Sequence, residues 1–195
     1  MTHHKQTLAP ASCEGEGASV HHPGRASVPT VIGLDVSLTS TGIAIGHRLT
    51  RVTSTGRKAD SLAVRCGRLR QLADQIDAQV RDVDLVVIEQ PAYSRSQGSA
   101  HDRSGLWWLV VDRLHGRGIP VAEVAPTSRA RYAAGRGNAG KDEVLAAAIR
   151  RYPDVPISGN DEADAYILAA MGLDHLGHPP VVVPQTHRAA LDKVA

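Results

Sequence analysis

Short runs of apolar residues, each closed by turn residues, predict three strands near the start of the patterned sequence. Residues 30–36 (TVIGLDV) and 41–47 (TGIAIGH) are mostly apolar, and the polar turn residues SLTS lie between them. Residues 48–56 (RLTRVTSTG) alternate polar and apolar positions. Such a succession is typical of an antiparallel meander. The first of these runs contains one acid, Asp35.

The middle of the chain alternates between helical and strand patterns. Leucine, alanine, isoleucine and valine recur every three or four residues over about 60–80, which predicts an amphipathic helix. Residues 84–91 (DLVVIEQP) are apolar until Glu89, as in a strand that is buried on both faces of a parallel sheet. A helix over roughly 103–116 and a short strand at 119–126 (IPVAEVAP) are expected to follow.

The last third predicts two more helices. A basic, glycine-rich stretch at 127–141 leads into a helix over about 141–151. The final helix is expected to start near Asn160, whose side chain would cap it. Residues 178–195 are expected to form an extended tail with a short helical end. The element order β-β-β-α-β-α-β-α therefore predicts an α/β domain, with a mixed five-stranded sheet flanked by helices.

Composition sets the limits of this domain at 29–177. Residues 1–28 mix Gly, Pro, Ser and His without periodicity and are expected to be a disordered leader. No apolar stretch approaches the ~18 residues of a membrane span, so no membrane association is expected. The two cysteines, Cys13 and Cys66, give neither a disulfide framework nor zinc-site spacing. A cytoplasmic location is therefore expected.

Charge is unevenly distributed along the chain. The net charge is only +2, which by itself indicates no nucleic-acid partner. Between Arg95 and Arg151, however, Lys and Arg outnumber Asp and Glu by ten to five. This excess is compatible with a nucleic-acid surface and equally with an ordinary solvated basic face.

Four acids occupy positions where the negative charge of a carboxylate needs a compensating cation or hydrogen bonds. Asp35 lies in an apolar strand, Glu89 closes another, and Asp161 and Asp164 share one face at the start of the last helix. Ligands of α/β sheets bind where strand ends open to solvent, so these acids are expected to converge there. Their repulsion favours a bound cation, and Mg²⁺ prefers carboxylate oxygens. Each acid alone also has a structural explanation, as a turn acceptor, a strand end or a partner of the helix dipole.

Three motifs in order carry a family resemblance over residues 30–175. They are IGLDVSLTSTG with Asp35, VVIEQP with Glu89, and NDEADAYILA with Asp161 and Asp164. Together they resemble the motifs of RuvC-like Holliday junction resolvases of the RNase H-like superfamily, particularly the phage-type relatives. Val36-Ser37 departs from the bacterial pattern, which has Pro-Gly there. The resemblance implies an RNase H-like fold for the sheet and helices predicted above.

The resemblance also implies a chemistry for the four acids. They would hold two Mg²⁺ ions, with Mn²⁺ as a substitute, and hydrolyse phosphodiester bonds of a branched DNA junction. Asp35 would bridge both ions. Lys141 would stabilise charge near the scissile phosphate, although a solvated lysine in a first helical turn is an equally good account. Two matched nicks in a two-fold symmetric junction imply a homodimer.

Several residues are candidates for DNA contacts. Tyr93 lies one position away from the place where the family has an aromatic residue after the second acid. Phosphate contacts position DNA without reading much sequence. The candidates are Tyr93, Ser96 and Gln97 in the polar loop after Glu89, and the arginines Arg95, Arg103, Arg129, Arg131 and Arg136.

Other functions remain open from the sequence. A different RNase H-like nuclease, acting on RNA, RNA–DNA hybrid or flap DNA, would use the same acids. A non-catalytic junction-binding protein would not need them. GLDVSLTSTG also resembles the phosphate-binding hairpin of actin-like ATPases, but those proteins need a second comparable domain, for which this chain is too short.

Overall fold

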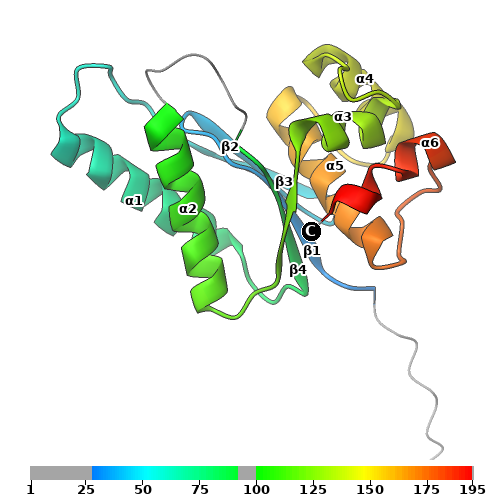
Figure 1. The fold of residues 1–195 in the computed structure, drawn as a ribbon, viewed down its shortest axis with the longest axis horizontal. Coiled ribbons are helices and arrows are strands. Elements are labelled where there is room, and N and C mark those ends of the chain that lie inside the picture. Colours follow the sequence, from blue (N-terminus) through cyan, green and yellow to red (C-terminus); the bar gives the residue numbers. More distant parts are fainter. Residues whose placement is uncertain (1–27, 92–99, 195) are drawn as a thin grey trace, which may run out of the picture.

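The protein is built around a mixed sheet of five strands. The computed structural model describes residues 28–91 and 100–194. In space the strand order is β3-β2-β1-β4-β5. Figure 1 shows the sheet between two groups of helices. The predicted α/β architecture and its five-stranded mixed sheet are confirmed. The strands are β1 (Val31–Asp35), β2 (Ser40–Ile45), β3 (Arg48–Thr53), β4 (Leu85–Glu89) and β5 (Val121–Val124).

Strand direction brings two sequence-distant acids to one edge of the sheet. β1, β2 and β3 form the antiparallel meander, whereas β4 pairs with β1 and β5 with β4 in parallel. Leu34 of β1 is in register with Ile88 of β4. The next residues, Asp35 and Glu89, therefore end adjacent strands at the same carboxyl edge.

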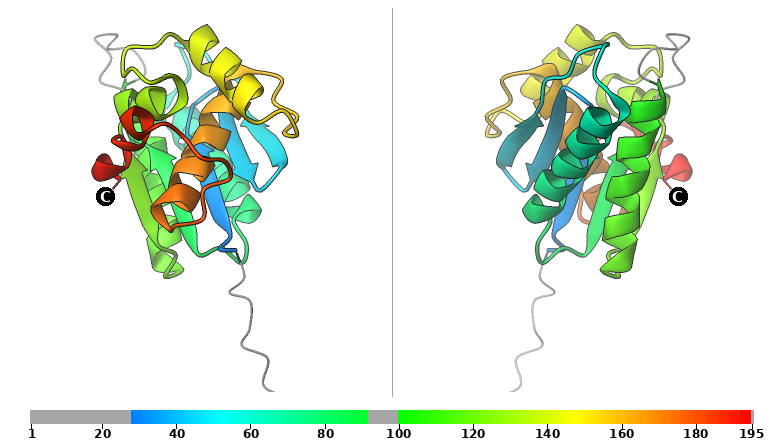
Figure 2. Two further views of the ribbon diagram at one scale, coloured as in Figure 1. Left: turned by 90° about the vertical axis from the view of Figure 1, so that its right-hand side faces the viewer. Right: turned by 90° about the vertical axis from the view of Figure 1, so that its left-hand side faces the viewer.

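Helices cover both faces of the sheet, as the two side views in Figure 2 show. Helices α1 and α2 lie on one face, and α5 packs on the other with α3 and α4 beside it. The C-terminal segment contacts α3 from outside. The helices are α1 (Leu62–Gln79), α2 (Ala100–Gly116), α3 (Pro126–Ala134), α4 (Lys141–Arg151), α5 (Asn160–His175), α6 (Gln185–Arg188) and a 3₁₀ turn (Leu191–Lys193).

Side chains along the central strands point alternately to the two faces of the sheet and contribute to two hydrophobic cores. Ile32 and Leu34 of β1 belong to the core under α1 and α2, whereas Val31 belongs to the core under α5. The same division applies to β4, where Ile88 and Val87 lie on opposite sides. Each strand of the sheet centre is thus buried on both faces, which explains the continuous apolar runs in the sequence.

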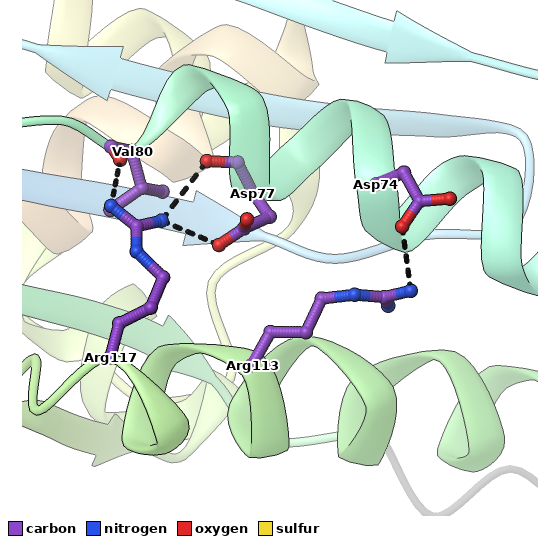
Figure 3. A network of polar contacts seen from close by, with 5 residues as sticks. All are labelled: Asp74, Asp77, Val80, Arg113 and Arg117. Atoms are coloured by element: carbon purple, nitrogen blue, oxygen red, sulfur yellow. Dashed lines mark hydrogen bonds and ion pairs between the residues drawn. The ribbon is translucent and has the colours of Figure 1, made fainter.

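Polar contacts link α1 and α2 on their outer side (Figure 3). Arg113 forms an ion pair with Asp74 at 2.7 Å, and Arg117 pairs with Asp77 and donates to the carbonyl of Val80 at 2.7 Å. Exposed ion pairs contribute little free energy, so apolar packing holds these helices to the sheet. The pairs connect the two helices at their surface.

Glycines let the backbone of α5 rest directly on the sheet. A Cβ atom on Gly33 of β1 would lie 1.9 Å from the carbonyl oxygen of Ala165, and one on Gly42 of β2 would lie 2.1 Å from that of Asp161. No side chain fits at either position without moving the helix. This contact brings the first turn of α5, with its acids, over the carboxyl edge of β1.

Helix α3 was not among the predicted elements. Its two arginines and the glycines that follow it hide the helical pattern, but Ala130, Tyr132 and Ala133 are buried against α4 and α5. The helix begins at Pro126 and is followed by Gly135, whose φ of 85° is the left-handed conformation common after helices.

The expected Asn160 cap is wrong, because Gly159 occupies the N-cap and Asn160 is the first helical residue. Instead, the carboxylate of Glu162 accepts hydrogen bonds from the backbone and hydroxyl of Ser158, at 2.8 and 2.6 Å. In the C-terminal segment, Val183 and Ala190 are buried in the core under α5, so this part of the chain packs rather than extends.

No helix within 28–91 and 100–194 is long and apolar enough to cross a membrane.

The α5 contact generates a first prediction. Replacement of Gly33 by Ala is expected to lower the free energy of unfolding by about 3 kcal/mol, because the new methyl group would collide with backbone atoms. A Cβ atom on Gly67 of α1 would meet no atom within 4 Å, so Gly67→Ala is expected to raise stability by about 0.5–1 kcal/mol. Urea unfolding of both variants measures this, and equal effects would contradict the close contact.

Candidate active site

The two strand acids line a pocket at the carboxyl edge of the sheet. Asp35 ends β1 and Glu89 ends β4, each as the first residue beyond a fully buried apolar run. The pocket has a volume of about 300 Å³. Because the two strands are parallel neighbours, their terminal carboxylates open into the same space.

The first turn of α5 supplies the other two acids. Asp161 and Asp164 line the same pocket, three residues apart, and Asp164 is only 2% exposed. Lys141, the first residue of α4, reaches the pocket as well. The structure thus brings together the four acids and the lysine that the sequence singled out. Glu162, between the two aspartates, instead holds the start of α5 through Ser158.

Hydroxyl groups shape the turn that follows Asp35. The Thr41 hydroxyl accepts a hydrogen bond from the backbone of Ser37 at 3.0 Å and donates to the carbonyl of Ser37 at 2.9 Å. Ser54, just after β3, donates to the carbonyl of Leu38 at 2.7 Å. These bonds satisfy backbone groups of the turn between β1 and β2, and they give the Thr41 hydroxyl a structural role.

Arg129 of α3 lies among the acids. Its guanidinium pairs with Glu89 through Nε and with Asp164 through Nη1, and the residue is only 7% exposed. A buried charge without a partner is costly, and here two carboxylates supply the partners. In the same way Arg129 offsets the mutual repulsion of the acids. Nothing in the sequence pattern distinguishes this arginine from its neighbours as the one that points inward.

Burial changes the protonation of the strand acids. Loss of solvent raises the pKa of Glu89 to about 7, because this effect outweighs the attraction of Arg129. Burial likewise raises the pKa of Asp35, opposed by Arg129 and Lys141 and reinforced by the charge of Asp161. The pocket therefore holds carboxylates that gain from any additional positive charge.

A tryptophan supports the end of β4. The indole Nε1 of Trp107 donates to the backbone carbonyl of Glu89 at 2.9 Å. Trp107 is 8% exposed, in keeping with a core role, whereas its neighbour Trp108 is 64% exposed on α2. The carbonyl of Glu89 is thus fixed from α2, while its side chain is fixed from α3.

The donor set of the pocket matches the requirements of a divalent metal. Within the described ranges, no three His, Cys, Asp or Glu residues are already clustered as a metal site. In this structure Arg129 pairs with two of the pocket acids, Glu89 and Asp164. The pocket offers four carboxylates in a buried setting, and carboxylate oxygens are the ligands that Mg²⁺ prefers. In donor chemistry the residues fit such an ion.

The predicted DNA contacts fall into three groups. Arg103 lines the pocket itself, and Arg131 is exposed on α3. Arg136 pairs with Glu143 of α4 at 2.9 Å, and the guanidinium of Arg129 is engaged by the acids. The remaining candidates lie outside the described residues, namely Tyr93, Arg95, Ser96 and Gln97.

The chain is similar to known proteins in both sequence and fold. No protein-family model matches the chain. The chain is 26% identical over 150 residues to the crossover junction endodeoxyribonuclease RuvC of Zymomonas mobilis, covering 74% of this chain and 90% of that protein. The chain resembles RuvC.

Solved structures give the same result for the fold. The structure of Thermus thermophilus RuvC superposes with a TM-score of 0.60 at 18% identity, covering 85% of this chain and 98% of that chain. T. thermophilus RuvC in complex with a Holliday junction substrate gives 0.58 at 19% identity, with the same coverage. The resemblance to RuvC-like resolvases and the RNase H-like fold expected from the sequence are confirmed.

The raised pKa of Glu89 predicts a pH dependence of stability. Between about pH 4.5 and 7 the folded protein keeps a proton on Glu89 that the unfolded chain has released, so stability falls as the pH rises. Without divalent metal, the free energy of unfolding is expected to fall between pH 4.5 and 8 by up to about 3 kcal/mol more in the wild type than in Glu89→Gln. Urea unfolding at several pH values measures the difference, and parallel profiles would contradict the buried state of Glu89.

The inward position of Arg129 predicts a contrast between two arginines of α3. At pH 8 without divalent metal, Arg129→Met is expected to lower the free energy of unfolding by about 3 kcal/mol, because it leaves two buried carboxylates without a cation. Arg131→Met, on the exposed side of the same helix, is expected to change it by less than about 0.5 kcal/mol. Thermal and urea unfolding measure both; similar losses would argue against the carboxylate pairing.

Proposed function

We propose that this protein is a divalent-metal-dependent endonuclease that cuts four-way or related branched DNA junctions. The observation that carries the proposal is the convergence of Asp35, Glu89, Asp161 and Asp164 in one pocket at the carboxyl edge of β1 and β4. Two comparisons support the substrate. The similar Zymomonas protein is named a crossover junction endodeoxyribonuclease, and the similar T. thermophilus RuvC has been solved with a Holliday junction.

The four acids would hold the metal, and Mg²⁺ is the ion we propose, with Mn²⁺ as a substitute and two ions per site. When bound, such ions supply Lewis acidity and a nucleophilic water at neutral pH. Asp35 is the natural central ligand, because it lies in the middle of the sheet edge, between β2 and the end of β4. The buried setting of Asp35 and Glu89 favours cation binding, since burial disfavours their charged forms without one.

The reaction is hydrolysis of a phosphodiester bond. A water oxygen forms a new bond to phosphorus, the bond from phosphorus to the 3′-oxygen breaks, and the departing 3′-oxygen takes up a proton. Lys141 lines the pocket, and its ammonium group would stabilise the charge that develops on the phosphoryl oxygens. Arg129 would act through the acids, by fixing Glu89 and Asp164 and reducing their repulsion.

A homodimer belongs to this proposal. A four-way junction has two-fold symmetry, and its resolution requires two matched cuts, one from each of two active sites. Within the described residues, one chain provides one pocket with these acids. Paired, symmetric nicks are therefore the expected product rather than one nick at an arbitrary place.

Cleavage assays test the proposal directly. In Mg²⁺, the wild type is expected to introduce paired nicks into a synthetic four-way junction and to leave linear duplex intact. Asp35→Asn is expected to lower the cleavage rate by about 10²–10³-fold, because it removes the central carboxylate. Binding of the junction in Ca²⁺ is expected to survive, since the substitution keeps the shape of the side chain.

Parallel substrates separate the competing functions. Preferential cutting of flap DNA or RNA–DNA hybrid would keep the metal site and change the substrate. Junction binding by the wild type without cleavage in either Mg²⁺ or Mn²⁺ would remove the catalytic part of the proposal. Melting temperatures of wild type and Asp35→Asn serve as the folding control.

A further inference from the structure

A second pocket, rich in positive charge, adjoins the candidate active site. It has a volume of about 510 Å³ and lies between the turn after β1, the loop from β3 to α1, and the facing sides of α1 and α2. We call it the basic groove. Its charged lining comprises five cations and one acid, namely Arg57, Lys58, Arg65, Arg68, Arg103 and Asp102.

The basic groove is continuous with the active-site pocket. Ser37 and Arg103 line both. The loop from β3 to α1 also lies at the same end of the sheet as the start of α5 (Figure 1). A polymer whose one phosphate enters the acid pocket would therefore pass directly into the basic groove.

One wall of the basic groove holds an arginine in a fixed position. Arg68 of α1 donates from Nε to the hydroxyl of Ser54 at 2.8 Å and from Nη2 to the carbonyl of Leu38. Gly56 leaves room for it, because a Cβ there would lie 2.0 Å from Arg68 Nη1. Both acceptors are uncharged, so the positive charge of Arg68 is not neutralised by these bonds.

A second arginine is held by the one acid that lines the basic groove. Arg65 donates from Nε to Asp102 at 2.9 Å across the gap between α1 and α2. The hydrogen bond from Arg65 holds the pKa of Asp102 below its usual range, so the acid is ionised at neutral pH. This pair accounts for one positive and one negative charge, and Arg57, Lys58 and Arg68 keep the basic groove positive.

The rim carries two exposed cations on an ordered loop. The carboxylate of Asp60 accepts a hydrogen bond from the backbone of Arg57 at 2.7 Å, and the backbone of Asp60 donates to the carbonyl of Arg57 at 3.1 Å. These bonds fix the loop through its main chain and leave the side chains of Arg57 and Lys58 exposed. Neither side chain takes part in an ion pair with any residue that the structure describes.

We propose that the basic groove binds the sugar-phosphate backbone of the DNA arm next to the strand that is cut. This inference rests on the proposed nuclease function and extends it to cations that lie outside the three sequence motifs. The fixed Arg68 and the exposed rim cations suit a chain of phosphates, because such contacts need charge at intervals rather than one closed cage. The groove opens into the acid pocket, which favours a polymer over a separate small phosphate ligand.

Salt-dependent binding tests the inference. The probe is a fluorescein-labelled four-way junction, with binding followed by anisotropy in Ca²⁺ over a range of salt concentrations. The double variant Arg57→Gln/Lys58→Gln is expected to reduce the slope of log K against log salt by about 2, since each lost phosphate contact removes about 1. Affinity at low salt is expected to fall accordingly.

Two matched variants control for overall charge and for side-chain identity. Arg48→Gln/Arg81→Gln removes the same charge from exposed residues at the opposite end of the sheet and is expected to keep the wild-type slope. Arg57→Lys/Lys58→Arg keeps the charge in the groove and is therefore also expected to keep the wild-type slope. Melting temperatures show that all variants fold.

The outcomes separate this inference from the proposed function. Junction binding by the wild type with an unchanged slope in Arg57→Gln/Lys58→Gln would overturn the groove assignment alone. An equal loss in Arg48→Gln/Arg81→Gln would also overturn it, because net charge would then explain the effect. Absence of junction binding by the wild type would overturn both proposals.

Discussion

The direct contact between the backbone of α5 and strands β1 and β2 is the constraint on which the site depends. Gly33 and Gly42 remove the side chains that would otherwise separate helix and sheet. The first turn of α5 is thereby held at the end of β1, and Asp161 and Asp164 meet the carboxylates of the strand ends. Larger residues at the two glycines would lift the helix, and four acids from three elements would no longer share one pocket.

The convergence of these four acids causes electrostatic repulsion, and a residue from a fourth element, helix α3, reduces it. Carboxylates brought together in a buried place repel one another and lose solvation, which is why the pKa values of Asp35 and Glu89 are raised. Helix α3 supplies Arg129 as an internal cation for Glu89 and Asp164. A metal ion would enter a site whose charge is already partly balanced, so Arg129 and the metal draw on the same carboxylates.

Much of this arrangement could be predicted from the sequence, and the rest could not for identifiable reasons. Apolar runs and turn residues were enough for the five strands, and the spacing of Asp161 and Asp164 was enough to place them on one face. Helix α3 was missed because its apolar core contacts are made by only two alanines and one tyrosine, within a glycine-rich and arginine-rich stretch. The inward direction of Arg129 was missed because charge counts do not show which arginine faces the acids. The basic groove joins three segments that are neighbours only in the fold.

The hydrogen bond between Trp107 and the carbonyl of Glu89 has a practical consequence. The protein contains two tryptophans, both on α2, and their rings meet edge to face with centroids 4.9 Å apart. One of them touches the backbone of a pocket acid, while the other is exposed to solvent. The intrinsic tryptophan fluorescence of this chain therefore originates next to the pocket, and emission spectra provide an optical signal from it without any attached label.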